Sequence, residues 1–114
     1  MRTVDDISLK EKDRLAIEEA VRLLKSQFPV AKVILFGSKA MGRADDESDI
    51  DLLILTTQTL NWRGRDKITD ALFDIELEHE VVISTLVATV DEWERGFWAV
   101  LPIRQEIERN GAAA

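Results

Sequence analysis

GSKAMGRADDESDID, residues 37–51, separates two apolar runs that each predict a buried strand. Residues 33–36 (VILF) precede this stretch and residues 52–55 (LLIL) follow it, and both runs consist of residue types that strands favour. Side chains two residues apart on a strand point to the same face. We therefore expect Asp49 and Asp51 to project side by side where the second strand begins.

Two neighbouring carboxylates repel each other unless a proton or a cation lies between them. A hard divalent cation with oxygen ligands, usually Mg²⁺, relieves this repulsion and creates a site for a nucleoside triphosphate. Residues 45–47 are acidic too, so five carboxylates fall within seven residues, and only Arg43 lies nearby in sequence to offset them. The alternative, an acidic solvated loop that runs into a strand, fits this concentration of charge less well.

Gly37 and Ser38 form a small-residue corner directly after the first apolar run. A glycine turn that leads into a helix offers backbone N–H donors to phosphate, and a serine adds a hydroxyl donor. We expect a short helix over 38–42 and phosphate binding at this corner, with Lys39 and Arg43 as flanking cations. Alone, the pair would fit an ordinary turn with a serine N-cap, but the acids downstream favour phosphate.

The composition is that of a single globular domain covering residues 1–114. The chain is 46% hydrophobic and has no cysteine, which excludes a disulfide framework. A formal net charge of −7 argues against unaided binding of long nucleic acid and suits either a basic protein partner or ordinary solubility. The polar N-terminus and the lack of a membrane-length apolar run predict a soluble, cytoplasmic protein.

The remaining pattern predicts helices packed around a small sheet, an α/β (α+β) fold. Capping boxes at 8–11 and 89–92 predict two helix starts, and an apolar stripe runs along the first helix to Phe28. Pro102 and Gly111 should begin and end the last helix. We expect strands over 31–36, 49–56 and 80–85, the last of them continuing towards 88, and a further helix over 65–78.

The stretch GSKAMGRADDESDIDLLIL resembles the nucleotidyltransferase superfamily related to DNA polymerase beta, and most of all its small stand-alone members, the minimal nucleotidyltransferases. The resemblance in element order extends over about residues 29–111. It implies a mixed sheet with three main strands. It further implies that Asp49 and Asp51 hold two Mg²⁺ ions, while Gly37 and Ser38 bind the β and γ phosphates of ATP.

A third carboxylate usually completes this kind of site from a later strand that lies beside the second. Glu80 is the expected residue because it opens the third apolar run, and Glu78 would lie on the same face by alternation. Simple surface solubility explains either glutamate equally well. Many relatives have an aspartate inside the strand here, and they often carry a basic residue where Met41 stands.

Bulky apolar residues gather near the C-terminus as Trp93, Phe97 and Trp98. We expect most of this group to lie in the core, and any exposed part to form a partner surface. Trp62 falls in the connection after the second strand, where it could stack on a base or cover the core. His79, the only histidine, is given no role.

The resemblance implies transfer of a nucleoside monophosphate, AMP from ATP, to a hydroxyl acceptor with release of pyrophosphate. Because the chain is nearly all catalytic core, the acceptor should be held by another protein. Stand-alone members are often paired with a helical HEPN-type toxin and act as antitoxins, some by adenylylating a tyrosine of the toxin. The alternatives are a vestigial site on a protein that silences its partner by occlusion, and a plain α/β domain with an accidental match.

Overall fold

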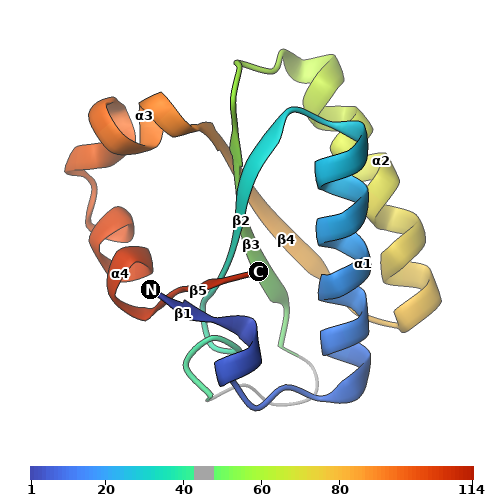
Figure 1. Cartoon of the computed structure of the whole chain (residues 1–114). Coiled ribbons are helices and arrows are strands. Elements are labelled where there is room, and N and C mark those ends of the chain that lie inside the picture. The colour runs from blue at the N-terminus through green and yellow to red at the C-terminus, as the bar shows by residue number, and fades with distance from the viewer. Residues whose placement is uncertain (43–47) are drawn as a thin grey trace.

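A mixed five-stranded sheet lies at the centre of the computed structural model, which describes residues 1–42 and 48–114 (Figure 1). The strand order is β1-β5-β2-β3-β4, with β3 antiparallel to β2 and parallel to β4. The three longer strands are those that the sequence predicts, and two short strands extend the sheet beyond β2. The strands are β1 (Arg2–Thr3), β2 (Val30–Phe36), β3 (Ile50–Thr56), β4 (Ile83–Thr89) and β5 (Ala112–Ala113).

Helices cover both faces of the sheet (Figure 1). One face carries α1 (Glu11–Gln27) and α2 (Trp62–His79). The other face carries the C-terminal elements, which are α3 (Val90–Arg95), the 3-10 helix η2 (Phe97–Val100) and α4 (Pro102–Asn110). A 3-10 turn, η1 (Val4–Asp6), precedes α1. No helix in the described part of the chain is long and apolar enough to cross a membrane.

Alternation along β3 divides the core into two halves. Leu52 belongs to the cluster under α1 and α2, whereas Leu53 belongs to the cluster that contains Trp93 and Ile107. Because successive strand residues face opposite sides, Asp51 shares a face with Leu53. Asp51 therefore points towards the side of the sheet that carries α3 and α4.

The first helix begins two residues later than its predicted capping box would place it. Its N-cap is Lys10, which makes no side-chain capping bond, so the prediction of a box opened by Ser8 is wrong. Ile7 is buried and Leu9 packs against the same core, which holds this segment outside the helix. The predicted apolar stripe is confirmed, because Ile17 and Leu24 are fully buried.

The third main strand does not open at Glu80, and that prediction is wrong. Helix α2 continues to His79, and Glu80 is its C-cap in the left-handed conformation, with φ 54°. The N–H groups of Glu80 and Val81 both donate to the carbonyl of Glu76 and complete the helix end. Strand β4 begins only at Ile83.

The C-terminal region follows its predicted signals, with one addition. Thr89 and Glu92 form the expected capping box, and Pro102 occupies the first turn of α4. Ala112, in a tail without any sequence signal, is completely buried and pairs with Leu35 as part of β5. Backbone pairing, which depends little on residue type, explains why this strand has no visible pattern.

Candidate active site

The glycine corner and Asp51 meet at the end of β2. Phe36 pairs with Asp51 in the β2–β3 register, so Gly37 comes directly beside the acid. Gly37 has φ +77°, and a Cβ atom at this position would lie 2.2 Å from Oδ2 of Asp51. The carboxylate therefore occupies the space that any side chain at residue 37 would need, so glycine is required both by conformation and by contact.

Asp49 lies at the same end of the sheet, beside strand β4. The hydroxyl of Ser84 donates a hydrogen bond to Oδ2 of Asp49 at 2.9 Å, and Ser84 is the register partner of Asp51. Burial, and secondly the charge of Asp49, raise the pKa of Asp51 above its ordinary value. The structure thus brings the two acids and Gly37 to one place, as the spacing of these residues predicts.

The two carboxylates lack a protein cation among the described residues, where neither of them forms an ion pair with lysine or arginine. Oxygen donors of this kind are what Mg²⁺ prefers, and a cation would remove the repulsion that raises the pKa of Asp51. The donor set therefore fits a hard divalent cation. The acidic residues 45–47 and Arg43, which were expected to contribute here, lie outside the described residues.

The segment after Gly37 is a pair of turns, so the prediction of a short helix over 38–42 is wrong. The N–H of Met41 donates to the carbonyl of Ser38 at 3.1 Å, and that of Gly42 donates to Lys39 at 3.4 Å. Gly42 has φ +69°, which ends the turn. A helix dipole is therefore absent from these residues, and any phosphate would be bound by local N–H and hydroxyl groups.

Lys39 is paired with an acid on α1 and not with Asp49 or Asp51. Its Nζ lies 2.8 Å from Oδ2 of Asp13 on α1, and both side chains are only 4% exposed. The expected contact between Lys39 and phosphate is therefore replaced by a buried ion pair. A sequence signal existed, because Asp13 precedes Ile17 by four residues and so lies on the apolar stripe of α1.

No carboxylate is present on the strand beside the acids. The residues of β4 are ISTLVAT, and the position opposite Asp51 is Ser84. Glu80, the expected third ligand, is exposed at the end of α2, and its carbonyl accepts a hydrogen bond from Lys12 at 3.5 Å. Glu78 lies two residues earlier, in the last turn of α2. Neither glutamate shares the strand with Ser84 that the prediction required.

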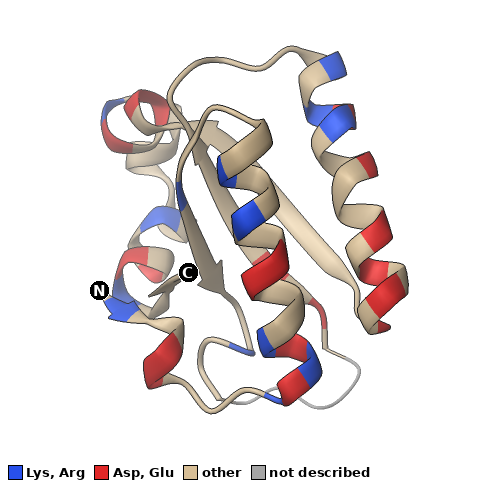
Figure 2. Cartoon of the chain, turned by 45° about the vertical axis from the view of Figure 1, so that its right-hand side comes forward, with Lys and Arg blue, Asp and Glu red and all other residues tan. Residues whose placement is uncertain are grey.

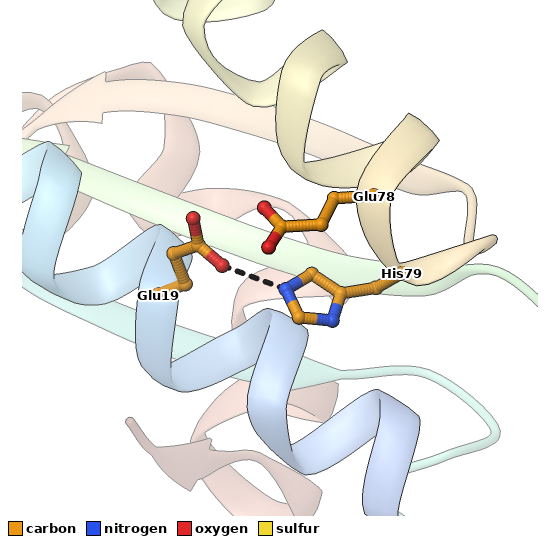
Figure 3. A group of neighbouring side chains, drawn as sticks. All are labelled: Glu19, Glu78 and His79. Carbon is orange, nitrogen blue, oxygen red and sulfur yellow. Dashed lines mark hydrogen bonds and ion pairs between the residues drawn. The ribbon is translucent and has the colours of Figure 1, made fainter.

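Glu78 instead belongs to a group with Glu19 and His79 between α1 and α2 (Figure 3). Nε2 of His79 lies 2.6 Å from Oε2 of Glu19, and one potential ligand atom from each of the three residues lies within 4.8 Å of the others. Acidic residues are frequent on the C-terminal half of α2 (Figure 2). Because α1 and α2 cover the face opposite to Asp51, we interpret this group as an ion pair between helices.

Trp62 also lies away from the acids. It is the first residue of α2, after the end of β3, whereas Asp51 lies at the beginning of that strand. Its ring is 67% exposed and carries the guanidinium of Arg63 at 5.3 Å from the ring centroid. Of the C-terminal aromatic group, Trp93 is buried and Phe97 is 73% exposed.

Comparison with known families gives a match over most of the region described above. The family model "Polymerase beta, Nucleotidyltransferase" matches residues 18–92, which include the corner and both acids. Two similar proteins of Methanocaldococcus jannaschii are "Putative protein adenylyltransferase MJ0141", 38% identical over 49% of this chain, and "Putative protein adenylyltransferase MJ0604", 39% identical over 63%. The matches span 57% and 69% of those proteins, respectively.

A third relative is "Probable protein adenylyltransferase MntA" of Haemophilus influenzae, 28% identical over 86% of this chain and 84% of its own length. Among solved structures, "Structure of putative minimal nucleotidyltransferase" is similar with a TM-score of 0.61 and 24% identity, over 94% of this chain and 97% of that chain. A toxin–antitoxin structure with AMP-PNP is similar with a TM-score of 0.59 and 17% identity, over 91% of this chain and 72% of that chain. The structure of a tri-AMPylated Shewanella oneidensis HEPN toxin in complex with MNT antitoxin is similar with a TM-score of 0.56 and 18% identity. The match covers 88% of this chain and 69% of that chain. These likenesses show the fold.

Proposed function

Because the chain belongs to the polymerase beta nucleotidyltransferase family, we propose that it transfers AMP from ATP to a hydroxyl group of a protein. The observation that carries this proposal is the carboxylate of Asp51 against Gly37, with the charge of Asp49 close by. The three relatives named above are protein adenylyltransferases by name, which supports a protein acceptor.

Asp49 and Asp51 would hold Mg²⁺, because they are neighbouring oxygen donors and form no ion pair among the described residues. When bound, the metal neutralises phosphate charge and lowers the pKa of the attacking hydroxyl. Ser84 keeps one oxygen of Asp49 oriented through its hydrogen bond. Partial burial of Asp51 reduces the screening of its carboxylate by water, which strengthens its interaction with a cation.

The corner would position the phosphates of ATP. Gly37 presents backbone without a side chain, and Ser38 offers a hydroxyl at the surface of the turn. In the transfer, the acceptor oxygen forms a bond to the α-phosphorus while the bond from that phosphorus to the bridging oxygen breaks. Pyrophosphate leaves with the electron pair, and the hydroxyl proton passes to water. Positioning and charge neutralisation supply most of the rate in such transfers.

We further propose that the acceptor is a helical HEPN-type toxin and that this chain acts as its antitoxin. The support is the named content of the toxin–antitoxin structures whose fold this chain shares. The chain also has a net charge of −7 and leaves Phe97 and Val100 73% and 81% exposed. A partner with basic and apolar residues would complement such a surface.

One observation favours a second candidate function, which is silencing by binding alone. The strand beside Asp51 carries Ser84 where a third carboxylate would complete the metal site. A site with two acids would bind metal more weakly, and a protein of this kind could neutralise its partner by covering it. Under this alternative, Asp49 and Asp51 would be dispensable for silencing.

The test is incubation of the chain with labelled ATP, Mg²⁺ and a HEPN-type protein as the candidate partner. We expect the label to appear on the partner, and to disappear with Asp49→Asn, with Asp51→Asn or with chelator. Silencing of the partner without any label, retained in both variants, would support the binding function instead. Asp70→Asn, which removes an exposed carboxylate on α2, is the matched control.

A further inference from the structure

A cavity of about 170 Å³ adjoins the candidate active site on the side of β2. Phe36 and Gly37 form its floor, and both residues also border the acid, through the strand register and through direct contact with Asp51. The opposite wall is α4, which covers this face of the sheet (Figure 1). A ligand that lay over the glycine corner could therefore extend into this cavity.

The lining of the cavity selects against phosphate. Met41, Ile103 and Ile107 make most of the wall apolar, and Glu106 is the one charged residue among its described lining. A carboxylate repels phosphate, and neither lysine nor arginine is among the described residues that line this space. Asn110 adds an amide that can donate and accept hydrogen bonds. Apolar walls with two polar side chains suit a flat heterocycle with hydrogen-bonding groups on its edge.

We propose that this cavity binds the adenine base of the donor nucleotide, an inference that rests on the proposed function. Phe36, Met41 and Ile103 would contact the base, while its phosphates remain over the turn that begins at Gly37. Pockets that bury a whole ligand have volumes of roughly 300–1,000 Å³, so this smaller cavity suits one ring system and not a complete nucleotide.

Glu106 and Asn110 would give the cavity its preference for adenine. The carboxylate accepts a hydrogen bond from the exocyclic amino group of adenine, and the amide pairs with a ring nitrogen. Guanine carries a carbonyl oxygen where adenine carries that amino group, so it would place one acceptor against another. The result is a preference for ATP over GTP that the phosphate corner alone cannot produce, because both nucleotides carry the same triphosphate.

The experiment compares the binding of non-hydrolysable ATP and GTP analogues and of tripolyphosphate, each with Mg²⁺, by calorimetry on the full chain. We expect the ATP analogue to bind about tenfold more tightly than the GTP analogue, the equivalent of one hydrogen bond. Glu106→Gln should reduce this ratio to about one to threefold. Ile103→Trp should fill the cavity and weaken the ATP analogue by about tenfold or more without changing tripolyphosphate affinity.

Glu94→Gln is the matched control, because it removes an exposed carboxylate of the same type from the neighbouring helix α3. ATP-analogue affinity that stays within about twofold of the original chain in both cavity variants would overturn the inference and leave the proposed function intact. Failure of the original chain to bind either the ATP analogue or tripolyphosphate would overturn both proposals together.

Discussion

Two aspartates lie on opposite sides of the turn that follows β2, and their surroundings differ in one respect. Asp13 faces the turn from α1 and is neutralised by Lys39 at 2.8 Å, with both side chains buried. Asp51 touches Gly37 on the other face of the sheet. There the charge of another acid, Asp49, helps to raise the pKa of Asp51. One carboxylate is paired with a lysine, whereas the other forms no ion pair with lysine or arginine in the part of the chain that the structure describes.

The difference separates a structural role from a functional one. A buried ion pair whose members satisfy each other has little left to offer a ligand, and it fixes the position of the turn. A carboxylate with a raised pKa, and without a lysine or arginine partner among the described residues, is in an environment that a bound cation would improve, which is typical of functional sites. The turn is therefore anchored on one face and available for binding on the other.

The largest expected effect comes from breaking the satisfied pair. Asp13→Ala would leave the ammonium of Lys39 buried without a partner and should lower the free energy of unfolding by about 3–5 kcal/mol. Urea unfolding followed by circular dichroism measures this loss. Asp5→Ala is the control, because the Asp5–Arg14 pair spans 3.6 Å with Asp5 85% exposed, and its loss should change the stability by less than about 1 kcal/mol. Equal losses in both variants would contradict the structural role of the pair.

Substitution of Asp51 should instead reduce activity without reducing stability. Asp51→Asn is expected to reduce AMP transfer by roughly 100-fold or more, because it removes charge where the metal and phosphates must be stabilised. The same substitution removes a partly buried charge that Asp49 repels, so the protein should remain folded with an equal or higher Tm. Label transfer and thermal unfolding, measured on one preparation, check both halves. A variant that unfolds would show that Asp51 supports the fold after all.

The contact at the corner can be isolated by a pair of glycine substitutions. Gly37→Ala introduces a Cβ at 2.2 Å from Oδ2 of Asp51, whereas Gly42→Ala has a similar φ of +69° and meets nothing within 4 Å. Both should lose about 1–2 kcal/mol because an L residue is strained at positive φ, and Gly37→Ala should lose more because its Cβ must also displace the Asp51 carboxylate. Only Gly37→Ala should also weaken binding of the ATP analogue, which calorimetry detects. Equal binding by both variants would separate Gly37 from the site.

The smallest effect concerns pH. Since burial and the charge of Asp49 raise the pKa of Asp51, the folded state holds a proton there more strongly than the unfolded state does. Without metal, this contribution to stability is present at low pH and is lost as pH rises through the raised pKa. The Tm of Asp51→Asn minus that of the original chain should thus increase with pH in the presence of a chelator. A flat difference would mean that the pKa is not raised.

The sequence predicts the elements around the corner well because their signals are local. Apolar runs on both sides of residues 37–51 define β2 and β3, and alternation alone places Asp51 beside the corner once these strands pair. The capping box of Thr89 is likewise local and is confirmed. Signals of this kind need no knowledge of distant residues.

The errors arise where distant contacts decide. Lys39 is buried because Asp13, 26 residues earlier, offers it a carboxylate, and nothing next to Lys39 in sequence reveals this. Glu80 precedes an apolar run but completes the hydrogen bonds of α2, so the strand starts later and Ser84 takes the place opposite Asp51. Ala112 pairs through its backbone alone. Each case depends on the tertiary structure and not on residue type.

The hydroxyl of Ser84 beside Asp49 has a consequence for how the protein acquires its ions. Two negative charges where β3 begins, next to a neutral group on β4, attract a divalent ion less strongly than three would. We expect the ion to arrive already complexed with the nucleotide, whose phosphates provide the missing charge. Loading would then follow the supply of metal–nucleotide complex in the cell and not the supply of free metal.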